Sequence, residues 1–163
     1  MQKAQDAGKY HVYVFEGGSR SGKTYGLIHF FLIYALQNPS LQTRIAIARK
    51  KATWLFATLW VDFVNILNST GLMQYCKVNN TLHTVQLFST TFTFVGLDDA
   101  QKLHGLTTDI VWINEAMEAT KTDFDQLEQR TSRFSVLDYN PSAEQHWIYD
   151  SVCQRPDCYF DHS

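Results

Sequence analysis

Short apolar runs alternate with longer amphipathic stretches along this chain. Four runs rich in β-branched and aromatic residues predict buried strands, at residues 10–15, 44–48, 110–113 and 134–137. Two longer stretches predict helices, Lys23–Gln37, which stops at an Asn-Pro pair, and residues 52–68, in which leucine or phenylalanine recurs every four residues. This alternation is typical of an α/β fold with a mostly parallel sheet covered by helices on both faces.

Shorter signals add detail to this plan. Residues 82–88 and 92–95 flank a Ser-Thr-Thr turn and predict an antiparallel hairpin. Two pairs have capping-box spacing and predict short helices near the end of the chain: Thr122 with Asp125, and Ser142 with Gln145, the second helix running through Trp147 and Tyr149. The sequence shows no internal repeat or linker, so residues 1–163 are expected to form a single domain.

Composition and charge limit the size of the domain and the ligands and surroundings that it could have. The 163 residues are 45% hydrophobic and 18% charged, as in one globular domain. The net charge of −2 gives no general attraction to nucleic acid, so DNA binding would need a local patch, such as Arg49-Lys50-Lys51, or another subunit. The three cysteines lack metal-ligand spacing and are expected to be free thiols. No apolar run approaches the roughly 20 residues that span a bilayer, so we expect no membrane contact.

The strongest chemical signal is a phosphate-binding loop between the first predicted strand and the first predicted helix. It matches G-x-x-x-x-G-K-[ST] in every fixed position: Gly17-Gly18-Ser19-Arg20-Ser21-Gly22-Lys23-Thr24. The glycines turn backbone N–H groups toward an anion, Lys23 would meet the β- and γ-phosphates, and the Thr24 hydroxyl would bind Mg²⁺. We therefore predict ATP and Mg²⁺ as ligands of this loop. The Arg20 guanidinium could reach the γ-phosphate or remain solvated at the loop tip.

A second acidic site follows the third predicted strand. Asn114 and Glu115 come directly after its apolar residues, and Glu115 is a candidate base for the water that attacks ATP. Asn114 offers Mg²⁺ a neutral oxygen in place of the more usual aspartate, and Asp138, at the end of a neighbouring strand, could supply the missing charge. Asp109 lies at the far end of its strand, about 15 Å away at roughly 3.3 Å per residue. The alternative is that Asn114 and Glu115 merely cap a turn.

Further motifs follow in a definite order along the chain. They are Ile47-Ala48-Arg49-Lys50, Gly96-Leu97-Asp98-Asp99, Lys102-Leu103-His104-Gly105, Gln126-Leu127-Glu128-Gln129-Arg130, Leu137-Asp138-Tyr139-Asn140-Pro141 and His146-Trp147-Ile148-Tyr149. Together with the P-loop and the acidic strand, this ordered set resembles the large terminase subunit of tailed bacteriophages, specifically its N-terminal DNA-packaging ATPase domain. The likeness extends from about residue 10 to the end of the chain.

The resemblance implies a P-loop NTPase fold of the ASCE type and a motor that drives double-stranded viral DNA into the procapsid in the host cell cytoplasm. It implies that Glu115 is the catalytic carboxylate, that Arg20 is the P-loop arginine, and that Asn140 belongs to the motif that senses the γ-phosphate. The implied partners are the small terminase subunit, the portal protein and further copies in a ring. The cation that acts on a neighbouring subunit's ATP is left open among His104, Lys102, Arg130 and Arg133.

Large terminases also carry a nuclease domain, which this sequence does not supply. We therefore expect a C-terminally truncated ATPase domain without nuclease activity. Two alternatives stay open, a P-loop metabolite kinase and a nucleotide-binding fragment without turnover. A glutamate at position 115 favours hydrolysis over transfer to a metabolite.

Overall fold

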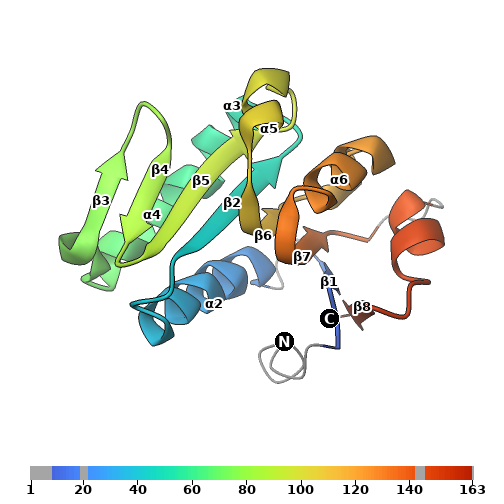
Figure 1. The fold of residues 1–163 in the computed structure, drawn as a ribbon, viewed down its shortest axis with the longest axis horizontal. Coiled ribbons are helices and arrows are strands. Elements are labelled where there is room, and N and C mark those ends of the chain that lie inside the picture. The colour runs from blue at the N-terminus through green and yellow to red at the C-terminus, as the bar shows by residue number, and fades with distance from the viewer. Residues whose placement is uncertain (1–8, 19–21, 142–145, 163) are drawn as a thin grey trace.

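The computed structural model describes residues 9–18, 22–141 and 146–162. These residues contain one eight-stranded sheet with the strand order β3-β4-β5-β2-β6-β7-β1-β8 (Figure 1). The parallel part contains β1 (Val12–Glu16), β2 (Thr43–Arg49), β5 (Thr90–Gly96), β6 (Thr108–Ile113), β7 (Thr131–Tyr139) and β8 (Cys158–His162). The antiparallel part adds β3 (Cys76–Asn79) and β4 (Thr84–Leu87) beyond β5.

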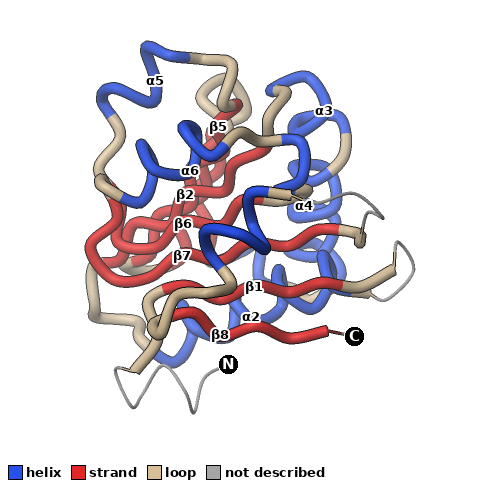
Figure 2. The backbone as a smooth tube through the Cα atoms, turned by 90° about the vertical axis from the view of Figure 1, so that its right-hand side faces the viewer, coloured by secondary structure: helices blue, strands red, loops and turns tan. Residues whose placement is uncertain are grey.

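Helices cover both faces of this sheet, which Figure 2 shows nearly edge-on. One face carries α2 (Lys23–Gln37), α3 (Ala52–Ala57), α4 (Leu59–Ser69) and the short 3₁₀ helix η1 (Leu72–Tyr75). The other carries α5 (Ala100–Gly105), the 3₁₀ helix η2 (Ala116–Glu118), α6 (Lys121–Glu128) and the π-helix η3 (Ile148–Val152). The predicted α/β class, with a mostly parallel sheet and an antiparallel hairpin, is confirmed.

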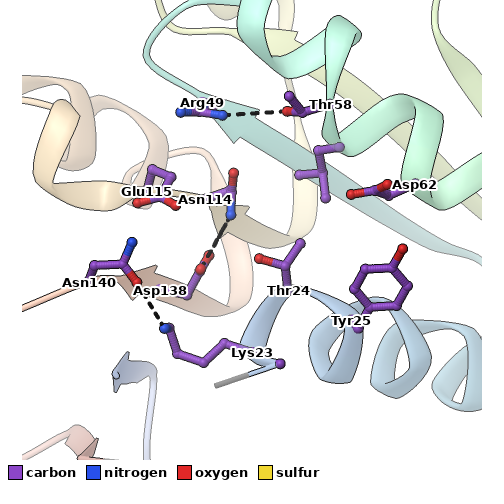
Figure 3. Close-up of a pocket in the computed structure, with 12 residues that line it drawn as sticks. Lys23, Thr24, Tyr25, Arg49, Thr58, Asp62, Asn114, Glu115, Asp138 and Asn140 are labelled. Atoms are coloured by element: carbon purple, nitrogen blue, oxygen red, sulfur yellow. Dashed lines mark hydrogen bonds between the residues drawn. The ribbon is translucent and has the colours of Figure 1, made fainter. Parts of the chain in front are cut away.

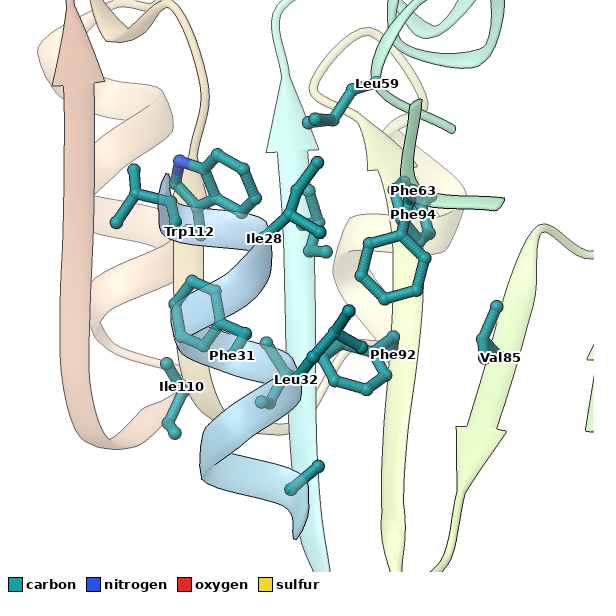
Figure 4. Close-up of a cluster of buried hydrophobic side chains, with 14 of the residues drawn as sticks. Ile28, Phe31, Leu32, Leu59, Phe63, Val85, Phe92, Phe94, Ile110 and Trp112 are labelled. Carbon is teal, nitrogen blue, oxygen red and sulfur yellow. The ribbon is translucent and has the colours of Figure 1, made fainter. Parts of the chain in front are cut away.

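Aromatic side chains fill the interface between α2, α4 and the sheet (Figure 4). Phe31 of α2 stacks on Trp112 of β6 with ring centroids 5.7 Å apart, and Phe63 of α4 meets Phe92 and Phe94 of β5 at 5.0 and 5.2 Å. All of these rings are fully or almost fully buried. Large buried rings dominate core energetics, so this layer fixes α2 against the sheet.

The single helix predicted over residues 52–68 is wrong, because the chain breaks into α3 and α4 at Thr58. The Thr58 backbone departs from helical geometry, with φ −122° and ψ −78°, while its hydroxyl donates to the carbonyl of Trp54. A threonine hydroxyl that bonds back to the preceding turn bends helices. Leu55 and Leu59, on either side of the break, are both buried, so the apolar spacing continues across it.

The predicted capping box is also displaced by two residues. Thr120, not Thr122, caps α6: its hydroxyl accepts from the backbone N–H of Asp123 at 3.1 Å, and the Asp123 carboxylate accepts from the N–H of Thr120 at 2.8 Å. Asp125 instead pairs with Lys121. The second box, Ser142 with Gln145, lies outside the described residues, and beyond it residues 148–152 form a π-helix. Strands β3 and β8 were not predicted.

None of the helices in the described ranges has both the length and the apolar character needed to cross a bilayer.

Candidate active site

A polar pocket of about 290 Å³ opens where α2 begins and where β2, β6 and β7 end. The carboxyl ends of parallel strands meet at one edge of a sheet, which is where open α/β folds bind ligands. Figure 3 shows side chains converging there from the starts of α2 and α4 and from the ends of β2, β6 and β7. The lining residues are Gly22, Lys23, Thr24, Tyr25, Arg49, Thr58, Leu59, Asp62, Asn114, Glu115, Asp138 and Asn140.

The start of α2 is built to face an anion. Gly22 adopts a left-handed conformation, with φ 74° and ψ 9°, which a glycine reaches without steric cost. No side chain among the described residues caps the helix there, and its first turn carries no acidic residue. The first N–H groups of an α-helix have no partner within the helix, and together with the helix dipole they favour a negative ligand.

Lys23 connects the P-loop to the segment after β7. Its ammonium donates to the carbonyl oxygens of Gly17 and Gly18, and to Oδ1 of Asn140 at 3.2 Å. Asn140 is therefore in direct contact with the loop lysine, although the two are 117 positions apart in sequence. The structure brings Gly17, Gly18, Lys23 and Asn140 together, while Ser19, Arg20 and Ser21 lie outside the described residues.

Asp138 lies beside Asn114, because Ile113 of β6 pairs with Leu137 of β7. The Asp138 carboxylate is 1% exposed and accepts from Trp112 Nε1 at 2.6 Å and from Asn114 Nδ2 at 3.2 and 3.3 Å. Burial raises the pKa of Asp138 to about 6, against the lowering effect of these two hydrogen bonds. Asp109 lies near the start of β6, at the other end of the strand from the pocket, as predicted from its position in the sequence. There its carboxylate accepts hydrogen bonds from Arg44 and Ser132.

Glu115 follows β6 in a backbone conformation that is rare for a residue with a side chain. Its φ and ψ are both 51°, which costs roughly 1–2 kcal/mol relative to right-handed geometry. The turn places its half-buried carboxylate on the wall of the pocket (Figure 3). Strained residues cluster at functional sites, so the conformation is consistent with a role in the pocket chemistry.

Arg49 is a pocket residue to which sequence reasoning assigned no role in the site: it appeared there in one motif of the resemblance and in a possible DNA-binding run. Its guanidinium donates to both carboxylate oxygens of Glu118, at 2.9 and 3.1 Å, and lies 5.5 Å from the ring of Trp54. The hydrogen bonds to Glu118 raise the pKa of Arg49 above its usual value. Lys50 is bound to Asp123 at 2.7 Å, so two of the three basic side chains are paired. The sequence feature that could have indicated a place in the pocket is the position of Arg49 at the end of a predicted strand.

The four candidate trans-acting cations do not line this pocket. His104 is exposed on α5, and Lys102 on the same helix lies 3.6 Å from Asp99. Arg130 donates to the Gln126 carbonyl, and Arg133 donates to the Tyr34 hydroxyl near the start of β2, at the other end of the sheet.

Glu16, the residue before the loop, occupies a second polar cluster that the sequence did not reveal. It is 6% exposed and accepts from the hydroxyl of Tyr149 at 2.5 Å and from that of Tyr139 at 3.1 Å. His162 of β8 lies 3.0 Å from its other oxygen. Residues of β7, η3 and β8 thus meet on one carboxylate directly behind the P-loop.

The donor set fits Mg²⁺ and ATP. Thr24, Asn114 and Asp138 present hydroxyl, amide and carboxylate oxygens, the ligands that Mg²⁺ takes, and in Figure 3 the Asn114 oxygen points away from Asp138. No group of three His, Cys, Asp or Glu side chains in the described ranges could hold a metal by itself. This agrees with the usual Mg²⁺ site, in which one or two protein groups act together with substrate phosphates.

The comparison with known protein families decides the identity at family level. The model of the phage terminase large subunit matches residues 9–163. This chain belongs to the phage terminase large subunit family. The resemblance inferred from the ordered motifs is therefore confirmed, while a search of curated proteins found no match.

Solved structures of terminases share this fold. The large terminase of the thermophilic bacteriophage D6E has a TM-score of 0.78 and 17% identity, over 94% of this chain and 40% of that one. The same terminase in complex with ATP-gamma-S gives 0.74 and 17%, over 94% and 39%. The large terminase ATPase domain of Thermus phage P74-26 gives 0.71 and 14%, over 98% and 79%. The present terminase chain thus spans about 40% of the D6E protein, and these identities establish the ASCE P-loop fold alone.

Proposed function

We propose that this chain is the ATP-binding and ATP-hydrolysing motor domain of a phage large terminase, which powers translocation of double-stranded viral DNA into the procapsid. The observation that carries the proposal is the meeting of Lys23, Glu115 and Asn140 in one pocket at the start of α2. Family membership supports the motor role, and the complex of the D6E terminase with ATP-gamma-S supports the choice of nucleotide.

Each pocket residue has a distinct role in this proposal. The N–H groups at the start of α2 and the Lys23 ammonium bind the β- and γ-phosphates, with Arg20 as a further cation of the loop. Thr24 and Asn114, with Asp138 behind them, hold Mg²⁺, which when bound neutralises charge on the phosphate oxygens. Glu115 orients the attacking water and accepts its proton.

Asn140 is proposed to report the state of the γ-phosphate. Its side-chain oxygen accepts from the Lys23 ammonium, and a phosphate that engages Lys23 competes for that same ammonium. Binding and release of phosphate would then change the position of Asn140 at the end of β7. In the assembled motor we propose a ring of copies that engages the portal protein, the small terminase subunit and DNA.

Two variants test the nucleotide chemistry. Lys23→Ala removes a charge-assisted contact worth roughly 1.5–3 kcal/mol, so we expect ATP affinity to fall about 10- to 150-fold. Glu115→Gln should bind ATP nearly as tightly as the parent but hydrolyse it about 10²-fold more slowly, because only the transition state needs the carboxylate. The readouts are calorimetric titration with Mg²⁺-ATP and release of radiolabelled phosphate without any acceptor.

Matched controls separate these effects from general damage. Lys51→Ala removes an exposed lysine, and Glu128→Gln removes a carboxylate of α6 that is paired with Arg155 outside the pocket. Both should retain binding and turnover. Equal ATP affinity for the parent and Lys23→Ala would refute the proposed phosphate site, and label transferred only to an added metabolite would indicate a kinase.

A further inference from the structure

Two of the three cysteine thiols meet beside β8, the strand at one edge of the sheet. Cys153 directly follows η3 and Cys158 begins β8, and both side chains are half-buried against the same apolar cluster. The Cys158 thiol donates a hydrogen bond to the sulfur of Cys153. All three cysteines are free, as predicted, but the sequence did not reveal that two of them are in contact.

The turn between η3 and β8 brings these thiols together. Two successive hydrogen bonds reverse the chain, from the N–H of Arg155 to the carbonyl of Val152 at 3.0 Å and from the N–H of Cys158 to the carbonyl of Arg155 at 3.1 Å. The Arg155 guanidinium donates to both carboxylate oxygens of Asp157, at 2.9 and 2.7 Å, and to Glu128 of α6 at 2.7 Å. The contact between the thiols is therefore held by a turn that is itself fixed to the domain.

The two thiols of this pair are not equivalent. The hydrogen bond from Cys158 lowers the pKa of Cys153, against the raising effects of burial and of the Glu16 charge. The same hydrogen bond, together with burial, raises the pKa of Cys158. The thiolate is the form of cysteine that attacks a disulfide, so Cys153 is the nucleophile of the pair and Cys158 is placed to attack whatever forms on its sulfur.

Cys76 provides a comparison within the same chain. It begins β3 and is half-buried like the other two cysteines. Its thiol donates to the carbonyl of Leu72 at 3.3 Å, and burial raises its pKa. Exposure alone does not distinguish Cys76 from Cys153, so a difference in their reactivity would come from the contact with Cys158.

We propose that Cys153 and Cys158 form a reversible redox site that reacts with small disulfides of the oxidised-glutathione class. The Cys153 thiolate attacks one sulfur of the small disulfide, which gives a mixed disulfide and a leaving thiolate that takes up the Cys153 proton. Cys158 then loses its proton and attacks the Cys153 sulfur, expelling the second thiolate, which takes up that proton. The chain is oxidised by the loss of two hydrogen atoms, and the small disulfide is reduced to two thiols.

The disulfide would join η3 to β8 by a covalent bond. The same two elements supply Tyr149 and His162 to the Glu16 carboxylate. In the oxidised chain η3 and β8 would therefore be linked twice, through Glu16 and through sulfur. Oxidation would restrict the movement of η3 against β8 directly beside the residue that precedes the P-loop.

The test is incubation of the folded chain with oxidised glutathione, followed by mass spectrometry of the intact protein and of its peptides. The parent should lose two hydrogen atoms and yield a peptide pair joined through Cys153 and Cys158, and dithiothreitol should reverse the change. Cys158→Ser should stop at one glutathione adduct on Cys153, because the second thiol is missing. Cys153→Ser should form its adduct on Cys158 about 10-fold more slowly.

The matched control is Cys76→Ser, which should form the internal disulfide at the parent's rate. In Cys158→Ser, Cys76 should take up glutathione about 10-fold more slowly than Cys153, and this difference should disappear in urea, where the turn is unfolded. A parent that keeps glutathione on Cys153 or Cys158 without forming the internal disulfide would overturn the proposal. Modification of Cys76 as fast as Cys153 in the folded variant would overturn it as well.

Discussion

The hydrogen bond between Asn114 and Asp138 allows a sharp test of the pocket by exchanging the two side chains. Asn114→Asp replaces a donor with a second carboxylate about 3.2 Å from the first, at a position that is 4% exposed. The lost hydrogen bond to a charged group is worth roughly 1.5–3 kcal/mol. Repulsion between two charges at that distance is about 5 kcal/mol at an effective dielectric constant of about 20, although uptake of one proton limits it.

We therefore expect Asn114→Asp to lower the free energy of unfolding by about 3–5 kcal/mol in the absence of Mg²⁺. Asp138→Asn alone should cost about 1–2 kcal/mol, because Trp112 can still donate to an amide oxygen. In the double variant the amide introduced at position 138 can donate to the carboxylate introduced at position 114 and accept from Trp112, which restores the network with donor and acceptor exchanged. About half of the summed loss of the two single variants should then be recovered.

Urea unfolding of the four proteins at constant pH measures this coupling as a double-mutant cycle. The expected coupling energy is about 2–3 kcal/mol in favour of the double variant. Asn80→Asp, at an exposed position, is the control and should change stability by less than about 0.5 kcal/mol. Costs that add to within about 0.5 kcal/mol would show that the two side chains do not act as a pair, and would refute this interpretation of the site.

Three further predictions concern other parts of the domain. If the Arg49 cation stabilises the transition state, Arg49→Ala should lower kcat for ATP by about 10²-fold with little change in ATP affinity, measured by phosphate release. An unchanged kcat would show that Arg49 serves only to hold Glu118. Burial acts to raise the pKa of Asp109, but hydrogen bonds from Arg44 and Ser132 outweigh it and lower this pKa. The stabilisation by Asp109 is therefore complete above about pH 4 and is lost as pH falls through the lowered pKa. Urea unfolding should show Asp109→Asn less stable than the parent by about 1–2 kcal/mol at pH 7, and the difference should shrink progressively as the pH is lowered below about 4. Finally, the isolated chain should bind ATP but hydrolyse it slowly, and turnover per site should rise about 10³-fold or more when a complete large terminase is assembled on proheads with DNA. Fast turnover by the dilute, monomeric chain would contradict a trans-acting cation.

Local patterns predicted those features of the fold that depend on neighbouring residues. The bounds of α2 follow from its composition and the Asn-Pro pair after it, and they agree with the structure. The break at Thr58 could not be predicted, because the four-residue apolar spacing is the same on both sides. The capping box was ambiguous because Thr-x-x-Asp occurs twice in overlapping positions, at 120–123 and 122–125, and only the structure shows which threonine precedes the helix.

The candidate site also contains some residues that local sequence patterns predict and others that they do not. The P-loop and Glu115 could be predicted because each is a contiguous motif attached to one strand. Arg49 could not, because its place beside Glu118 depends on the pairing of β2 with β6, and the two side chains are 69 positions apart. Asp138 was proposed as a neighbour of Asn114 from strand order alone, but the Trp112 hydrogen bond to it needed the side-chain geometry.

The hydrogen bonds of Glu16 connect the residue before the P-loop to η3 and β8. Glu16 is joined by one peptide bond to Gly17, whose carbonyl accepts from Lys23, and its carboxylate is held by Tyr149 and His162. Pulling a carboxylate from one such partner costs roughly 1.5–3 kcal/mol, so a displaced loop would carry η3 and β8 with it more easily than it would separate from them. In the proposed motor, a displacement at the phosphates would therefore reach β8, at the edge of the sheet, through the Glu16 carboxylate.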